Sequence, residues 1–186
     1  MNNKKIIWIA FVLLVLLQLW APASMIYNRE SVLKNGHSFK FRTAPVDPSD
    51  PFRGKYIVLD FDENSFVTRD SGRWERGDDV FVQLTTDTAG FAKIKSLHKQ
   101  VPAVQDYVKA TVNYIGYDSL KAVFIEWPFD RFYMEESKAN AAEQAYIKSS
   151  RDSNQVTYAL IKVKNGESVL ENVFINNQPI VTFINK

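Results

Sequence analysis

The sequence contains no cysteine and only two histidines, His37 and His98. Without cysteine the chain can form neither a disulfide nor a thiolate metal site. Two histidines are too few for a multi-histidine zinc site. A Ser-His-Asp triad would need partners that the sequence does not indicate for either histidine. The residues therefore predict no metal site and no cofactor.

The chain also lacks an excess of charge of either sign. It has 23 basic and 21 acidic residues, and its formal net charge is +2. Two of the lysines, Lys4 and Lys5, precede the apolar N-terminus, so the rest of the chain is neutral. Nucleic-acid binding needs a concentrated basic face, which this balance argues against. The same balance of charges argues against electrostatic binding of the domain to anionic lipid.

Charge is missing altogether from one long segment, Ile6 to Ile26. At about 1.5 Å per residue a helix of this length spans roughly 30 Å, the thickness of the hydrocarbon layer. Lys4 and Lys5 before it predict an N-terminus inside the cytoplasm. Trp20 and Tyr27 are expected at the far interface as aromatic anchors.

We therefore expect a cytoplasmic stub and transmembrane anchor over residues 1–27, and an exported domain over residues 28–186. The expected location is the cytoplasmic (inner) membrane, crossed once, with the domain on the periplasmic side. A cleaved signal peptide is the alternative, because Ala21-Pro22-Ala23 has the small-x-small form of a cleavage site. The apolar run continues through Ile26 and is long for a signal peptide, which favours the anchor.

The exported part has the pattern of a mainly β (α+β) domain with antiparallel strands and one surface helix. Alternation of Phe39 and Phe41 is typical of a half-buried strand, and Asn165-Gly166 is a strong hairpin signal. Strands are expected at 37–43, 55–61, 79–86, 90–97, 107–117, 120–127, 156–164, 167–175 and 179–184. The Ala-, Glu- and Lys-rich segment 135–148 predicts the helix.

The stretch DPSDPFRGKYIVLDF, residues 47–61, combines turn and strand signals. Its two Asp-Pro pairs predict a rigid loop that leads into a strand. On that strand Ile57, Leu59 and Phe61 share a wholly apolar face, which we expect to point into the core. Tyr56 lies on the half-polar face. The residues that we expect to bind a ligand or partner, if this stretch has such a role, are Asp50, Arg53, Tyr56 and, further along the chain, Arg131.

The stretch resembles the signature of the GDYXXLXY family, which is named for that motif. The motif residues here are Gly54-Lys55-Tyr56-Ile57-Val58-Leu59-Asp60-Phe61, with Lys55 in place of the family Asp and Phe61 in place of the final Tyr. The Asp-Pro prefix and the segment FIEWPFDRFYMEESKANAAEQAY (124–146) also resemble the family. The resemblance implies a membrane-anchored bacterial protein without an established activity, and a multi-span membrane protein as a partner. Lys55 implies that a carboxylate at that position is not required.

These features favour a non-catalytic envelope module that binds a membrane or envelope partner. Phe129, Phe132 and Tyr133 beside Arg131 are either a contact patch for that partner or core residues beneath the helix.

Two further functions are open. A Ser-Lys hydrolase similar in outline to signal peptidases would use Ser24 with Lys93 or Lys95 as its base. A carboxylate-based or sugar-binding protein would use acids from one of two groups. These groups are Asp60, Asp62 and Glu63, and Glu126, Asp130 and Glu135.

Overall fold

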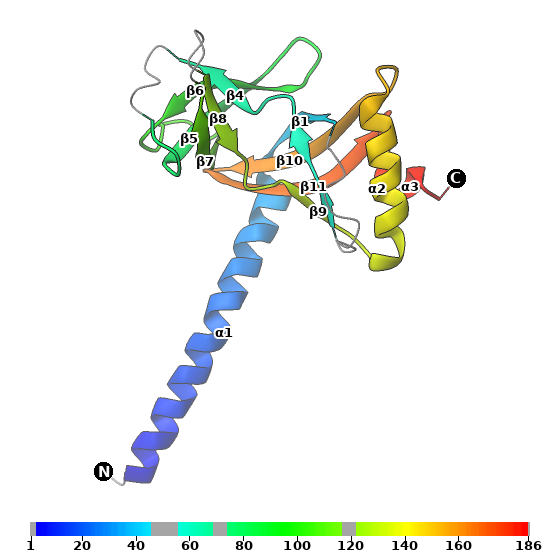
Figure 1. Cartoon of the computed structure of the whole chain (residues 1–186). Helices are drawn as coiled ribbons and strands as arrows, with labels where there is room; N and C mark the ends of the chain where they lie inside the picture. The colour runs from blue at the N-terminus through cyan, green and yellow to red at the C-terminus, as the bar shows by residue number, and fades with distance from the viewer. Residues whose placement is uncertain (1–2, 46–55, 69–73, 117–121, 186) are drawn as a thin grey trace.

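The computed structural model describes residues 3–45, 56–68, 74–116 and 122–185, which form a β domain carried on a long N-terminal helix (Figure 1). The helices are α1 (Asn3–Asn35), α2 (Glu136–Arg151) and α3 (Ile180–Phe183). The strands are β1 (His37–Ala44), β2 (Tyr56–Val58), β3 (Asp60–Phe61), β4 (Ser65–Val67), β5 (Asp79–Thr86), β6 (Ala92–His98), β7 (Tyr107–Ile115), β8 (Ala122–Glu126), β9 (Arg131–Tyr133), β10 (Thr157–Lys164), β11 (Glu167–Ile175) and β12 (Gln178–Pro179).

The strands form two five-stranded sheets and one two-stranded sheet. The first sheet has the order β12-β11-β10-β1-β3, the second has the order β4-β8-β7-β5-β6, and β2 pairs with β9. All strand pairs are antiparallel. Single parallel bridges, Lys40 to Phe91 and Val108 to Gly166, join the two large sheets. The mainly β, antiparallel class that the sequence predicts is confirmed.

The core lies between the sheets and contains a cluster of aromatic rings. The expected alternation in β1 is confirmed, since Phe39 and Phe41 are buried while their neighbours are exposed. The Phe41 ring centroid lies 5.6, 5.2 and 5.1 Å from those of Phe61, Trp127 and Phe129. Edge-to-face contacts of this kind add to the free energy gained by removing each ring from water.

The predicted strand 55–61 is two strands in the structure. β2 pairs with β9 and β3 pairs with β1, and Leu59 lies between them outside any strand. The Leu59 N–H donates a hydrogen bond of 2.8 Å to the Asp130 carbonyl, so the chain changes partner here without leaving this backbone group unpaired. The apolar face is confirmed, because Ile57, Leu59 and Phe61 are all buried.

The hairpin at Asn165-Gly166 is confirmed, and its tip also touches the second sheet. Both residues have positive φ angles, 50° and 88°, as a type I′ turn requires. The Gly166 N–H donates to the Tyr107 carbonyl at 3.1 Å, and the Gly166 carbonyl accepts from the Lys109 N–H at 2.9 Å. A Cβ at position 166 would lie 2.7 Å from Cε2 of Tyr107, so the close approach also requires glycine.

The predicted strand at 179–184 is wrong beyond Pro179, which ends β12, because Ile180–Phe183 form the short helix α3. Ile180, Phe183 and Ile184 recur at the spacing of one helix face, and all three pack on the core. A short apolar run hides that period, since it fits a strand equally well. The predicted helix is confirmed as α2, which buries Ala139, Ala142 and Tyr146.

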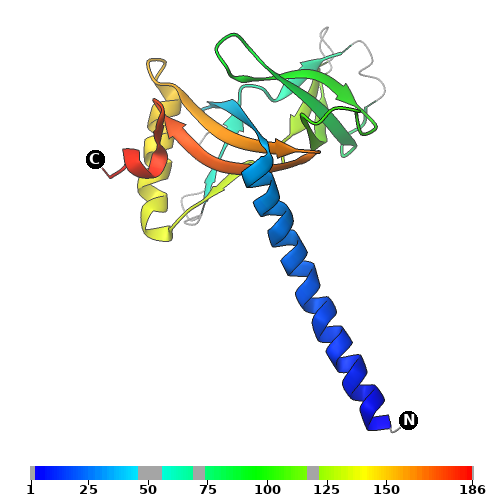
Figure 2. The same cartoon turned by 180° about the vertical axis from the view of Figure 1, so that it is seen from behind.

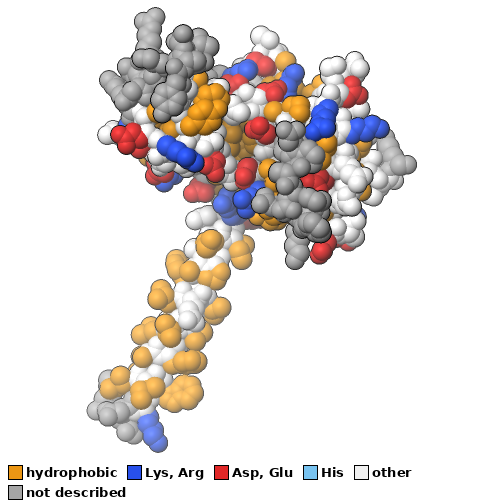
Figure 3. Space-filling model, in the orientation of Figure 1, with side chains coloured by type: hydrophobic (Ala, Val, Ile, Leu, Met, Phe, Trp, Pro, Cys, Tyr) orange, Lys and Arg blue, Asp and Glu red, His pale blue; other side chains and the backbone are white. Residues whose placement is uncertain are grey.

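Helix α1 extends beyond the apolar run into the domain. Its last turns pack against the β10–β11 hairpin (Figure 2). Val32 in these turns is buried. Arg29 Nη1 donates to the Ser168 carbonyl at 2.7 Å, and Lys164 Nζ donates to Ser31 Oγ at 2.8 Å. Hydrophobic side chains cover the protruding part of the helix (Figure 3). The domain does not bury this apolar segment.

The buried phenol of Tyr146 predicts a loss of stability at alkaline pH. Its hydroxyl donates to the Ala44 carbonyl at 3.3 Å, and burial raises the pKa of Tyr146 to about 12 from 10.0. Because the folded pKa is the higher one, this stabilising term is complete below pH 10 and is lost as the pH rises towards 12. A two-unit shift corresponds to about 3 kcal/mol.

We expect the free energy of unfolding to fall less steeply between about pH 10 and about pH 12 in Tyr146→Phe than in the unaltered protein. Urea unfolding across this range measures the difference. Tyr133→Phe, which alters an exposed phenol, should follow the unaltered protein. If the free energy of unfolding falls equally steeply with pH in all three proteins, the prediction is contradicted.

Candidate functional site

Two of the predicted site residues, Tyr56 and Arg131, meet on the outer face of the small β2–β9 sheet. Tyr56 lies opposite Tyr133 in the strand register, and their ring centroids are 5.4 Å apart. The Arg131 guanidinium lies 5.3 Å from the centre of the Tyr56 ring, a cation–π distance. Tyr133 is 65% exposed. We call Tyr56, Arg131 and Tyr133 the β2–β9 patch.

The positive charge of Arg131 is favoured by its neighbours. A side-chain hydrogen bond with Tyr133 and then the Asp130 carboxylate raise the pKa of Arg131. The other two predicted site residues, Asp50 and Arg53, lie outside the described residues, as does Gly54 with the Asp-Pro prefix. The structure thus brings together Tyr56 and Arg131 and does not place the remaining pair.

The three aromatic residues near Arg131 do not form one contact surface. Phe129 is buried in the aromatic core, 5.3 Å from the stacked ring of Trp127. Phe132 is half-buried and packs against that core, because it points to the inner face of β9. Of the three, Tyr133 alone faces solvent. The interpretation as a contact patch is therefore wrong for Phe129 and Phe132.

Acidic residues from both predicted groups line one cleft between the sheets. Asp60, Glu126 and Asp130 lie around a space of about 320 Å³, together with Asn64, Asn113 and Tyr114. Leu59, Phe61, Phe124, Ile125 and Trp127 complete the lining. We call this space the acidic cleft. Asp130 precedes Arg131, so the cleft and the β2–β9 patch are neighbours in the chain.

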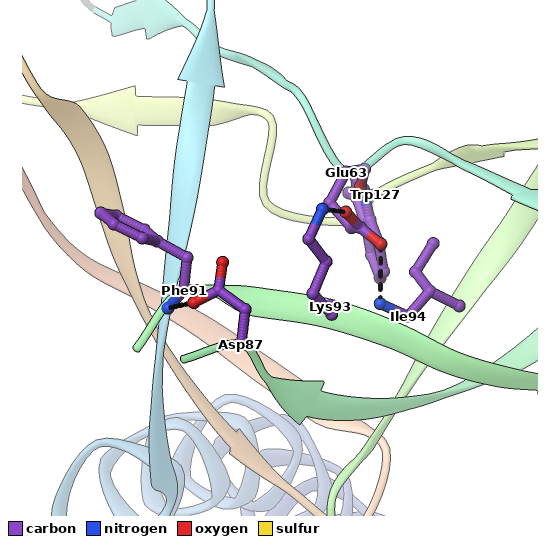
Figure 4. Close-up of polar contacts among 6 residues, drawn as sticks. All are labelled: Glu63, Asp87, Phe91, Lys93, Ile94 and Trp127. Atoms are coloured by element: carbon purple, nitrogen blue, oxygen red, sulfur yellow. Dashed lines mark hydrogen bonds and ion pairs between the residues drawn. The ribbon is translucent and has the colours of Figure 1, made fainter. Parts of the chain in front are cut away.

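Glu63 has a structural role instead (Figure 4). Its two carboxylate oxygens accept from Lys93 Nζ at 2.5 Å and from the Ile94 N–H at 2.9 Å, and its carbonyl accepts from Trp127 Nε1 at 2.8 Å. In the same view Asp87 accepts from the Phe91 N–H at 2.8 Å and closes the β5–β6 turn. Glu135, the last member of the second group, pairs with Lys138 at 2.7 Å beside α2.

The residues of the hydrolase alternative do not form a catalytic pair. A lysine acts as the base of a serine when its pKa is lowered, but the hydrogen bond with Glu63 raises the pKa of Lys93. Ser24 lies in the apolar part of α1, and its hydroxyl donates to the Ala21 carbonyl at 2.8 Å. Lys95 is exposed on β6.

A serine–histidine contact on β6 was not predicted. Ser96 Oγ lies 2.8 Å from His98 Nε2 and donates to Gln83 Oε1 at 3.0 Å. In the sequence, this contact is indicated only by the two-residue spacing of Ser96 and His98 on an expected strand, which places both side chains on one face. Within the described ranges no carboxylate contacts the His98 ring, so the pair lacks the third member of a triad.

The comparisons with known proteins agree with the resemblance carried by residues 54–61 and 124–146. A family model described as "GDYXXLXY protein" matches residues 18–173, which is most of the chain. No curated protein and no solved structure matches. The match therefore supplies a family but no activity.

The contacts of Glu63 predict a graded loss of stability. Glu63→Ala should lower the free energy of unfolding by about 1 to 3 kcal/mol, because the Ile94 N–H loses its acceptor. Glu63→Gln keeps an oxygen for the Ile94 N–H but places an amide NH2 towards Lys93, so it loses only the hydrogen bond and ion pair with Lys93, and its effect should be smaller. Chemical denaturation measures both variants. Glu135→Ala, which removes an exposed ion pair, is the control, and equal effects of all three would contradict the assignment.

Proposed function

The chain belongs to the GDYXXLXY family, and we propose that it is a single-pass envelope module that binds a membrane or envelope partner without catalysing a reaction. The observation that carries this proposal is the continuity of α1, which runs unbroken from the apolar segment into its docking site on the domain. A domain attached in this way is held at one height and one orientation above the bilayer. A fixed height and orientation would favour binding to a partner in the same membrane.

The same continuity supports a retained anchor over a cleaved signal peptide. Ala21, Pro22 and Ala23 lie inside α1, with twelve further helical residues after them. Proline within a membrane helix is tolerated, because neighbouring groups satisfy the carbonyl that it leaves free. The inner-membrane location with the N-terminus inside rests on Lys4 and Lys5 before the apolar run.

The β2–β9 patch supports a binding role for this face. Tyrosine and arginine are enriched among the residues that dominate binding energy at protein interfaces. Tyr56 and Tyr133 are held by strand pairing, and Arg131 lies over the Tyr56 ring. Binding would therefore immobilise few side chains that are mobile in the free protein, which lowers its entropic cost. A multi-span membrane protein is the partner we propose, because an anchored domain would remain near the bilayer surface, where it can meet such a protein.

Topology can be tested by cysteine labelling, because the chain has no cysteine of its own. Val101 is 62% exposed on the domain, and Asn3 precedes the apolar run. We expect a membrane-impermeant maleimide to label V101C in intact spheroplasts and to label N3C only after the membrane is permeabilised. Labelling of N3C alone in intact spheroplasts would overturn the orientation.

The patch can be tested by photo-crosslinking in living cells. A photoreactive amino acid at position 133 should give a discrete adduct with a membrane protein, whereas the same residue at position 101 should not. Arg131→Ala should reduce the adduct on the order of tenfold, which corresponds to a loss of about 1.4 kcal/mol of binding free energy. Its thermal unfolding should be unchanged, because Arg131 is half-exposed. Equal adducts at both positions would contradict a site at the patch.

A further inference from the structure

An irregularity in β7 turns an aromatic side chain towards the acidic cleft. The register between β7 and β8 shifts between Val112 and Tyr114, so Asn113 is an extra residue in β7. Val108, Ala110 and Val112 point inward at every second position. Regular alternation would place Tyr114 inward as well, but the bulge leaves both Asn113 and Tyr114 exposed. Bulges that redirect side chains in this way are common beside functional sites.

The redirected Tyr114 forms a flat wall of the cleft. Its ring stacks on Phe124 with centroids 4.1 Å apart and planes 12° apart, and Tyr114 remains 48% exposed. The negatively polarised face of such a ring attracts C–H groups that carry a partial positive charge. The C–H face of a pyranose ring has this character, because each of its carbons is bonded to oxygen.

The polar groups of the cleft suit hydroxyl groups on the edge of such a ring. Carboxylates from Asp60, Glu126 and Asp130 accept hydrogen bonds, and the amides of Asn64 and Asn113 both donate and accept them. Within the described part of the chain, neither Asp60 nor Glu126 forms an ion pair, and Arg131 approaches Asp130 only to 3.8 Å. Asp60 Oδ1 accepts from the Phe61 N–H at 2.8 Å, and the remaining acceptor positions of the three carboxylates are available to a ligand.

Acidic residues on a surface are common and do not by themselves indicate a ligand. Here they surround a cleft that also has a stacked, exposed aromatic wall and two amides. The volume of about 320 Å³ lies at the low end of the range for small-molecule sites. We propose that the acidic cleft binds a neutral saccharide, with Tyr114 stacking on a sugar ring and the carboxylates and amides binding its hydroxyls. Carboxylated or phosphorylated sugars are disfavoured by charge repulsion.

The experiment uses the full-length chain in lipid nanodiscs and isothermal titration with three probes. Neutral cellotetraose and chitotetraose should bind, and a tetramer of galacturonic acid should bind at least about tenfold more weakly, a difference of about 1.4 kcal/mol. Tyr114→Ala should weaken binding of the neutral probes about tenfold or more, whereas Tyr114→Phe keeps the ring and should stay within about twofold. Glu126→Gln is a second variant, which removes one carboxylate from the cleft but retains the backbone and the size of the side chain. It should also weaken binding of the neutral probes.

The matched control is Tyr133→Ala, which removes an exposed tyrosine from the β2–β9 patch and should leave saccharide binding unchanged. This control separates the saccharide site from the partner site, so failure of either proposal can be recognised without the other. Absence of binding by both neutral probes would overturn the saccharide proposal. Displacement of a bound neutral probe by putrescine at equal concentration would also overturn it, since the cleft would then select positive charge.

Discussion

The carboxylate of Glu63 holds the point at which the chain passes from one sheet to the other. The segment leaves the first sheet after β3 and enters the second at β4. At this crossing Glu63 binds Lys93 and the Ile94 backbone of β6, while its own carbonyl binds the Trp127 indole. Asp60 lies before the crossing and Glu126 lies beside Trp127, so the bond from the Trp127 indole to the Glu63 carbonyl connects the two walls of the acidic cleft.

Helix α1 is joined to the same framework through the β10–β11 hairpin. Arg29 and Ser31 of α1 bind the hairpin near its tip, and Gly166 at the tip exchanges two backbone hydrogen bonds with β7. β7 in turn carries Asn113 and Tyr114 into the cleft. A series of side-chain and backbone hydrogen bonds therefore links the end of α1 to one wall of the cleft.

The strands and their faces could be predicted because they depend on local patterns. Alternation identified the core side of β1, and Asn165-Gly166 identified the hairpin, since both signals are contained within a few residues. The split at Leu59 depends on the distant Asp130 carbonyl, and the bulge at Asn113 depends on the pairing with β8. The meeting of Tyr56 with Arg131 likewise follows from pairing of β2 with β9. None of these three features has a signal within its own segment.

The motif residues gain separate roles once the chain is folded. Leu59 and Phe61 are buried, and Phe61 contacts Phe41 and Phe129 in the aromatic core. Tyr56 lies in the β2–β9 patch and Asp60 lines the acidic cleft. Alternation along an extended chain produces this division, since successive side chains point to opposite sides. One short segment thus packs into the core with one set of side chains and leaves Tyr56 and Asp60 at the surface with the other.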